Sequence, residues 1–235
     1  MKIHDVPQRS YEWADLRSGI PTASEFNNLV TPKKWAVKKG GAVDSYLAYK
    51  LAEKWQGGAL SGTATFDMDQ GNILEEEAIP WFSFTFDQPV QKVGFITSDD
   101  GTVGCSPDGL IQDGGLEIKC PTPEVHCRHL LLEDVPPQYA AQVHGGMYVT
   151  GRSYWKFVSY RRRFPPLIVT VFRDDKIIAV IDEAVKLFTA RLELAFQRMC
   201  ERNGGPPPPV ERYRPDPYEK PQEPDWTKDQ VGITP

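Results

Sequence analysis

One predicted strand in the middle of the chain, residues 116–120, constrains the fold more than any other segment. Its residues alternate in the way that a β-strand requires when one of its faces is buried. Glu117 and Lys119 therefore lie on one face, while Ile118 points into the core. The strand thus presents an acid and a base side by side on a sheet.

A second acidic residue precedes this strand. Asp108 lies in the segment 106–110, and a glycine-rich turn at 112–115 lets the chain fold back. This return brings Asp108 beside Glu117 at one edge of the sheet. Two carboxylates that lie so close repel each other when both are ionised, and a hard divalent cation relieves the repulsion. The two segments therefore predict a metal site.

Mg²⁺ is the expected ion, because it binds through a few carboxylate oxygens and completes its octahedron with water or phosphate. We expect two such ions, which Mn²⁺ can replace, with Asp108, Glu117 and the backbone carbonyl of Ile118 as ligands. Such a centre suits phosphodiester hydrolysis. Lys119 either activates the attacking water or neutralises developing charge, and the sequence leaves both roles open. From these positions alone, a charged surface hairpin is the alternative.

The rest of the chain shows an ordered series of helical and extended patterns. The predicted helices cover residues 11–18, a short segment from 22, 42–56, 66–79, 123–132, 136–149 and 175–201. The predicted strands cover residues 92–97, 102–106, 109–111, 116–120, 153–160 and 167–172. This order predicts a mixed α/β (α+β) fold with a central mixed β-sheet flanked by helices. With the acids and the lysine, it is typical of the PD-(D/E)xK core of restriction endonucleases.

Local signals refine several elements. Residues 22–25 fit a capping box that opens a short helix. The helix at 42–56 is expected to bury one stripe, formed by Val43, Leu47, Leu51 and Trp55. Pro80 is expected to end or kink the helix that precedes it. Trp155, Phe157 and Tyr160 are expected in the core rather than on a base-stacking surface.

By composition the chain divides into two parts. Residues 1–202 hold the predicted elements and are expected to form the PD-(D/E)xK domain. Residues 203–235 are rich in proline and poor in apolar residues, so we expect an extended arm or a disordered tail. No apolar run approaches the roughly 20 residues that span a bilayer. Without a secretory signal either, the chain is expected to be cytoplasmic.

The formal net charge of −5 argues against a protein that coats DNA through bulk electrostatics. It does not exclude an enzyme that acts on DNA, because metal-binding carboxylates contribute to this sum. Basic clusters at 33–34, 38–39 and 161–163 either meet phosphates or are solvated loops.

Two other kinds of site have weaker support. His126, Cys127 and His129 lack a second pair of ligands at the spacing of a zinc finger. An iron–sulfur cluster needs four cysteines, whereas Cys105 and Cys120 lie on predicted strands and fit small core residues.

Several blocks of the sequence resemble the phage lambda exonuclease family, also called YqaJ-like viral recombinases or alkaline exonucleases. The resemblance extends from about Trp13 to Arg173. Its blocks are residues 13–25, 71–75, 105–110, 116–121 and 139–150. The sequence departs from the family pattern at Pro21, and at Gly145 and Gly146, which are expected to soften their helix.

The resemblance implies a role for each of five residues. Asp108 and Glu117 bind Mg²⁺, and Lys119 is the catalytic lysine. Glu75 helps to hold a metal-bound water, and Gln142 orients the nucleophile or a phosphate. A solvated helix position is the alternative for Gln142.

The resemblance also implies that Arg17, Ser24 and Ser106 form a pocket for the 5′-terminal phosphate of DNA. A guanidinium forks onto phosphate oxygens, and Ser24 lies in the first turn of a predicted helix, whose N-terminus attracts anions. The alternatives are a surface charge for Arg17 and a capping role for Ser24.

The function that the resemblance implies is a Mg²⁺-dependent 5′-to-3′ exodeoxyribonuclease that acts on linear double-stranded DNA ends. Its product is a 3′ single-stranded overhang for phage-type recombination by strand annealing. A ring-shaped homotrimer, a phage single-strand annealing protein as partner, and a phage or prophage origin in a bacterial host are expected as well. A restriction-type endonuclease and a non-catalytic DNA-binding protein are the alternatives. A closed circular duplex distinguishes the first alternative, and an assay with Mg²⁺ or EDTA distinguishes the second.

Overall fold

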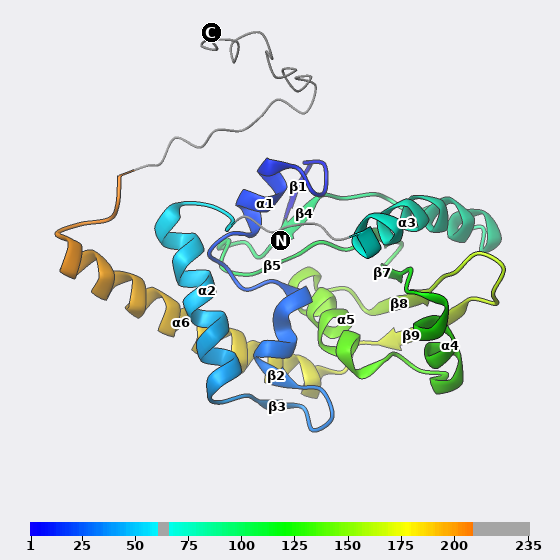
Figure 1. Cartoon of the computed structure of the whole chain (residues 1–235). Helices are drawn as coiled ribbons and strands as arrows, with labels where there is room; N and C mark the ends of the chain where they lie inside the picture. The colour runs from blue at the N-terminus through cyan, green and yellow to red at the C-terminus, as the bar shows by residue number, and fades with distance from the viewer. Residues whose placement is uncertain (61–65, 209–235) are drawn as a thin grey trace, which may run out of the picture.

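The computed structural model describes residues 1–60 and 66–208 (Figure 1). Its main sheet has four strands in the order β6-β7-β8-β9. Their bounds are Gly109–Ile111, Gly114–Lys119, Tyr154–Ser159 and Leu167–Phe172. β7 and β8 are parallel, whereas β6 and β9 pair antiparallel with their neighbours. The predicted mixed sheet is therefore confirmed.

The predicted strands at 92–97 and 102–106 are shorter than expected and belong to a second sheet. That sheet has the order β1-β4-β5, with bounds Lys2–His4, Phe95–Thr97 and Gly104–Cys105. A separate two-stranded ribbon consists of β2 (Val30–Thr31) and β3 (Ala36–Val37). The sequence did not predict β1, β2 or β3, because strands of two or three residues are too short to show a hydrophobic period.

The helices follow the predicted order. They are α1 (Tyr11–Arg17), the 3-10 helix η1 (Ala23–Asn28), α2 (Gly41–Gln56), α3 (Phe66–Thr85), α4 (Pro123–Leu132), α5 (Pro137–Thr150) and α6 (Asp175–Asn203). None of the helices in the described residues is long and apolar enough to cross a membrane. The predicted tail from residue 209 onward lies outside the described residues.

Two helices cover opposite faces of the main sheet (Figure 1). Phe82 of α3 packs with Ile118 on one face. Met147 of α5 packs with Trp155 and Phe157 on the other, so these two aromatic residues lie in the core as expected. Tyr160 is only partly buried, at the edge of the α3 face. The alternation along β7 therefore places Ile118 under α3 and its two charged neighbours under α5.

α3 continues past Pro80 to Thr85, which corrects the expected end of this helix. A proline inside a helix removes one backbone hydrogen bond. The packing of Ala78 and Phe82, which are both fully buried against the main sheet, holds the helix together on either side of the proline.

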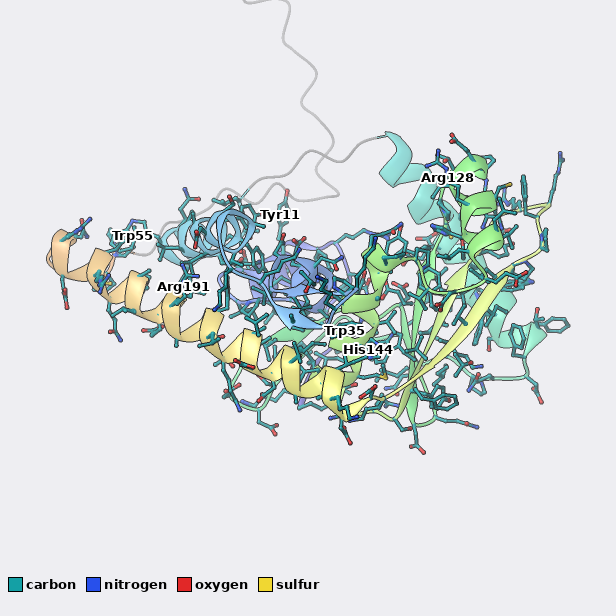
Figure 2. The ribbon with its side chains drawn as sticks, turned by 90° about the horizontal axis from the view of Figure 1, so that it is seen from below. Tyr11, Trp35, Trp55, Arg128, His144 and Arg191 are labelled. Carbon is teal, nitrogen blue, oxygen red and sulfur yellow. The ribbon has the colours of Figure 1, made fainter. Side chains whose placement is uncertain are left out.

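The apolar stripe predicted for α2 is only partly correct. Val43 is buried, but Trp55 is half-buried and meets Phe196 of α6 edge to face (Figure 2). The most buried positions of the second half of α2 are polar: Lys50 and Glu53 are 5% and 4% exposed. Their side chains form an ion pair at 2.8 Å, so each charge has a partner inside the protein.

The glycines of the predicted turn at 112–115 have a different role. Gly114 and Gly115 belong to β7, where a Cβ atom would lie 2.3 Å from the rings of Tyr154 and Trp155. The turn itself is confined to the two residues before them, and Gln112 has a left-handed φ of 38°.

α5 runs without interruption through Gly145 and Gly146, the two helix positions where the sequence departs from the family pattern. A Cβ atom at Gly145 would lie 2.6 Å from the ring of Phe26 in η1. A Cβ atom at Gly146 would lie 2.6 Å from the ring of Trp155. These two glycines therefore let α5 approach both η1 and the main sheet closely.

Candidate active site

The β6–β7 hairpin holds Asp108 next to Glu117. The backbone N–H of Asp108 donates to the carbonyl oxygen of Leu116 at 3.1 Å. The Oδ2 atom of Asp108 accepts from the backbone N–H of Ile118 at 2.5 Å. Burial raises the pKa of the Asp108 carboxyl, and the charges of Glu117 and Glu75 raise it further. The two carboxylates therefore lie next to each other, as predicted.

Glu117 lies on the face of β7 that α5 covers, and it is only 3% exposed. Its Oε1 atom lies 2.5 Å from Nζ of Lys119 and accepts from Nε2 of Gln142 at 2.6 Å. Burial raises the pKa of Glu117, while Lys119 opposes this shift. Gln142 thus points from α5 into the site and is not a solvated helix residue.

Lys119 is surrounded by negative charge. Burial by itself lowers the pKa of this amine, but Glu117 and Asp108 more than offset the effect and raise the pKa. The ammonium also lies 5.4 Å from the centre of the Tyr139 ring, a favourable position for a cation. In this arrangement the two carboxylates favour the charged form of the amine.

Glu75 reaches the same place from α3. Its carboxylate and Asp108 line one cleft of about 440 Å³, together with Arg9 and Lys92. The Oε2 atom of Glu75 accepts from Nη2 of Arg9 at 2.9 Å. The structure therefore brings Glu75 to the carboxylate pair.

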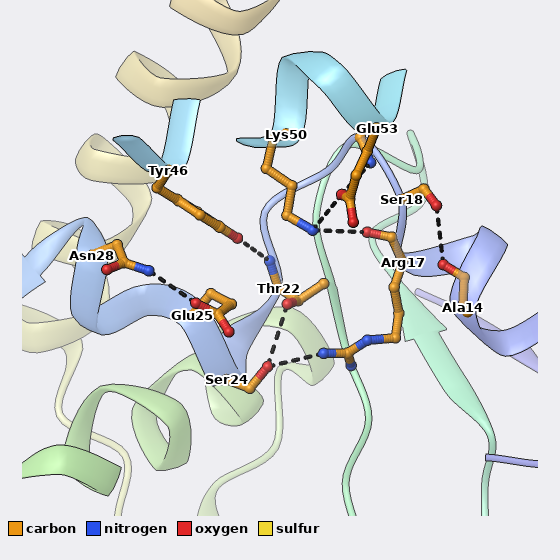
Figure 3. Close-up of polar contacts among 11 residues, drawn as sticks. Ala14, Arg17, Ser18, Thr22, Ser24, Glu25, Asn28, Tyr46, Lys50 and Glu53 are labelled. Atoms are coloured by element: carbon orange, nitrogen blue, oxygen red, sulfur yellow. Dashed lines mark hydrogen bonds and ion pairs between the residues drawn. The ribbon is translucent and has the colours of Figure 1, made fainter. Parts of the chain in front are cut away.

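A second group of polar side chains lies at the end of α1 (Figure 3). The guanidinium of Arg17 donates to Oγ of Ser106 through Nη1 and to Oγ of Ser24 through Nη2, both at 3.0 Å. Nε1 of Trp13 also donates to Ser106, at 2.9 Å, and the Trp13 ring lies 4.3 Å from the guanidinium carbon. Burial lowers the pKa of Arg17. The three predicted residues meet, and Trp13 joins them.

Sequence reasoning did not assign Trp13 to the site. The available signal was its spacing of four residues from Arg17 on one helix, which places both side chains on the same face.

The predicted capping box at 22–25 is wrong. Thr22 makes no side-chain capping bond, and its Oγ1 atom lies 3.3 Å from Oγ of Ser24 instead. η1 is a 3-10 helix of six residues, so its dipole is too small to support the expected anion site. Ser24 belongs to the group because of its contact with Arg17.

The buried pair on α2 supports the backbone that carries Arg17 (Figure 3). Nζ of Lys50 donates to the carbonyl oxygen of Arg17 at 3.2 Å. Oε2 of Glu53 accepts from the backbone N–H of Gly19 at 3.0 Å, where the chain turns through a left-handed φ of 67°. The sequence pattern of α2 gave no signal for this support, because both charges looked like solvated helix positions.

The two polar groups belong to one site. A small pocket is lined by Ser24 and Ser106 of the Arg17 group and by Glu117 and Gln142 of the carboxylate group. Four of the predicted residues, from widely separated parts of the sequence, therefore line one small pocket, and Arg17 contacts two of them.

The histidines at 126 and 129 form a separate buried cluster. Nδ1 of His126 and Nδ1 of His129 lie 2.8 and 2.9 Å from the hydroxyl of Ser159. Cys105 is buried in the core, as expected for a small core residue.

Residues 12–153 match the family model of the YqaJ-like viral recombinase domain. The chain belongs to this family. The site residues from Arg17 to Gln142 all lie inside the matched segment of the YqaJ-like chain. Arg9 lies outside it.

Solved structures with the same fold include an alkaline exonuclease (LHK-Exo) from Laribacter hongkongensis. It is 29% identical to the YqaJ-like chain, has a TM-score of 0.74, and the match covers 83% of this chain and 98% of that chain. The complex of LHK-Exo with dAMP has the same identity and coverage and a TM-score of 0.75. These relatives confirm the predicted PD-(D/E)xK-type fold.

A phage-related exonuclease from Haemophilus somnus 129PT shares the fold alone, with 15% identity and a TM-score of 0.57. That match covers 77% of this chain and 96% of the other. No curated protein sequence matches significantly.

The donor set of the YqaJ-like site fits magnesium. Among the described residues, no group of three or more His, Cys, Asp or Glu side chains forms a ready metal cage. Mg²⁺ does not need such a cage, because it commonly binds through one or two carboxylates and keeps several waters or phosphate oxygens. Asp108 and Glu117 are held together by the fold although burial opposes the charge of both. A divalent cation would relieve that conflict.

Proposed function

We propose that this YqaJ-like protein is a Mg²⁺-dependent exodeoxyribonuclease that digests linear double-stranded DNA from a 5′-phosphorylated end. One observation carries the proposal: Ser24 and Ser106, the two serines that the Arg17 guanidinium contacts, line a small pocket together with Glu117 and Gln142. A fork of donors that fits a phosphate therefore lies beside a centre that fits phosphodiester hydrolysis.

Membership of the family supports the general part of this proposal, that the protein is a nuclease that acts on DNA. LHK-Exo, the relative with 29% identity, is an alkaline exonuclease that was solved in complex with dAMP. A nucleoside monophosphate is the class of product that an exonuclease releases.

Asp108, Glu117 and the backbone carbonyl of Ile118 would hold the metal, as one or two Mg²⁺ ions that Mn²⁺ can replace. When bound, the ion supplies Lewis-acid chemistry at the phosphate. Lys119 adds a fixed positive charge beside Glu117. Glu75 from α3 and Gln142 from α5 enter the site from two sides of β7, where they orient the attacking water.

The proposed reaction adds water to phosphorus and breaks the bond to the 3′ oxygen of the terminal nucleotide. The phosphate then stays on the shortened strand, and a proton passes to the leaving 3′ oxygen. The new end is again a 5′ phosphate, which fits the Arg17 pocket. Repeated digestion leaves the opposite strand as a 3′ overhang, the form of DNA that strand-annealing recombination uses.

Two further parts of the proposal concern assembly. The family resemblance supports a ring-shaped homotrimer that encloses the duplex and a phage single-strand annealing protein that receives the overhang. Sedimentation of the purified chain measures the first, and co-purification with the annealing protein of the same phage measures the second. A monomer that digests long duplex DNA without dissociating would rule out the ring.

The experiment that tests the function compares three substrates with Mg²⁺ or EDTA. They are a linear duplex with 5′-phosphate ends, the same duplex with 5′-hydroxyl ends, and a closed circular duplex. We expect rapid digestion of the first, slow digestion of the second and none of the circle. Cutting of the circle would favour a restriction-type endonuclease, and the absence of any digestion would favour a non-catalytic DNA-binding protein.

Replacement of Arg17 by alanine is expected to slow digestion of 5′-phosphorylated ends by about 10- to 150-fold. This range corresponds to the roughly 1.5–3 kcal/mol of a hydrogen bond to a charged group. Ends with a 5′ hydroxyl are expected to change little, since they lack the phosphate that Arg17 contacts. The measurement is the ratio of the two initial rates in the wild type and in the variant.

Arg17→Lys serves as the matched control, because it keeps the charge but loses the fork. We expect it to recover only part of the rate on phosphorylated ends. An equal loss on both kinds of end would instead assign Arg17 to general DNA contact or to the structure of the α1 region.

A further inference from the structure

Arg9 lies before α1, in a segment that is fastened to the active site. Its neighbour Gln8 donates through Nε2 to the carbonyl oxygens of Val93 at 3.0 Å and Pro107 at 2.9 Å. Pro107 directly precedes Asp108, so this anchor ties the segment to the carboxylate hairpin. The backbone at Arg9 is left-handed, with a φ of 70°, which is uncommon for a residue other than glycine. The fold thus holds Arg9 in a specific place.

The guanidinium of Arg9 already touches one member of the site. Its Nη2 atom donates to Oε2 of Glu75 at 2.9 Å, and the Arg9 side chain is 45% exposed. A guanidinium has five N–H donors in a planar fork, and this bond uses one of them. The fork is therefore oriented by Glu75 while it still faces the solvent.

The space in front of Arg9 is a cleft that ends at Asp108. The cleft has a volume of about 440 Å³, which is within the usual range of ligand sites. It carries two cations, Arg9 and Lys92, beside the carboxylates. The small pocket near Arg17 is lined by other residues and meets the site at Glu117. The cleft at Arg9 is therefore a cationic approach to the Asp108 side of the site, separate from the pocket at Glu117.

We propose that Arg9 binds a phosphate of the digested DNA strand on the Asp108 side of the cleaved bond. Its hydrogen bond to Glu75 holds the fork in position while the remaining donors meet the phosphate. This inference rests on the proposed function. It adds a substrate contact outside the segment that matches the family model, residues 12–153.

The competing explanation is that Arg9 only neutralises Glu75. Both explanations predict some loss of affinity for DNA when Arg9 is replaced, but they differ in two respects. A phosphate contact releases counterions from DNA, so its loss lowers the salt dependence of binding by about 0.9 for each contact. If Arg9 only neutralises Glu75, replacing Arg9 should not affect DNA binding once Glu75 is replaced by an uncharged residue.

The test measures binding of a short linear duplex with 5′-phosphate ends by fluorescence anisotropy. It uses the full chain with Lys119→Ala, which is expected to slow digestion by about 10²- to 10³-fold, at fixed Mg²⁺ over a series of KCl concentrations. Arg9→Ala is expected to weaken binding about 10-fold or more. It should also lower the slope of log affinity against log salt by about one. Arg9→Lys should keep the slope and recover part of the affinity.

Arg191→Ala is the matched control, because Arg191 on α6 is 49% exposed and also pairs with a carboxylate, Asp44 (Figure 2). We expect it to change neither affinity nor slope. The Arg9→Ala series is repeated with Glu75→Gln in the background. The same decrease in slope there supports the proposal, whereas an unchanged slope in either background overturns it.

The outcome for the unaltered protein separates this inference from the proposed function. If the wild type digests linear duplex DNA and Arg9→Ala leaves the slope unchanged, only the role of Arg9 is wrong. If the wild type neither binds nor digests DNA, both the function and the role of Arg9 are wrong.

Discussion

Alanine at Asp108 or at Glu117 is expected to reduce DNA digestion by about 10²-fold or more, the usual effect of losing one preorganised contact to a transition state. Each change removes a proposed metal ligand from a pair that the β6–β7 hairpin holds together. DNA binding is expected to persist, because the proposed phosphate pocket is formed by Arg17, Ser24 and Ser106 and not by the two carboxylates. The measurements are the initial rate at saturating Mg²⁺ and the affinity for linear duplex DNA.

Asp108→Asn is a control for folding. The amide can still accept the hydrogen bond that the Ile118 N–H donates to Asp108, so the hairpin should remain intact. We expect this variant to unfold at a temperature close to that of the wild type and still to be inactive. If any of the three variants keeps more than about a tenth of the wild-type rate, the metal centre lies elsewhere.

Alanine at Lys119 is expected to lower turnover by about 10²- to 10³-fold, with little effect on folding or DNA binding. The ammonium lies 2.5 Å from Glu117 and over the ring of Tyr139, so its charge is held beside a proposed metal ligand. Arginine at this position should not restore the rate, because its planar fork cannot take the place of a compact ammonium. A fully active Lys119→Arg enzyme would rule out the role of the amine as a base, one of its two proposed roles.

The pH profile distinguishes those two roles. The pKa of Lys119 is raised in the folded protein because Glu117 and Asp108 favour the ammonium over the neutral amine. The rate is therefore not expected to fall as the pH passes the ordinary lysine value of about 10.4. A rate that rises in proportion to a deprotonating amine at lower pH would instead show that Lys119 acts as a base.

The sequence predicted the catalytic strand well because its information is local. Alternation along β7 is sufficient to place Glu117 and Lys119 on one face. Helix boundaries were less certain where packing overrides local preference, as at Pro80, which lies inside α3 because Phe82 is buried beyond it. The capping box failed because the hydroxyl of Thr22 has a competing partner in Ser24.

The contacts that assemble the site are long-range, and single-sequence reasoning has little access to them. Arg17 meets Ser106 across 89 positions of the chain, and only the family resemblance suggested that contact. Arg9 meets Glu75 across 66 positions, and no pattern in the sequence pointed to it. Lys50 was missed for a related reason, since a buried lysine has the same local sequence pattern as an exposed one.

The glycines of α5 have a consequence for the spacing of the two ends of the site. Gly145 lets α5 lie against η1, so it sets the distance between Gln142 on one helix and Ser24 on the other. If these two side chains hold the attacked bond and the terminal phosphate, their separation must match the distance between those two groups of the DNA. A methyl group at Gly145 would push η1 outward and spoil this match. The rate on 5′-phosphorylated ends would then report a packing contact that takes no part in the chemistry.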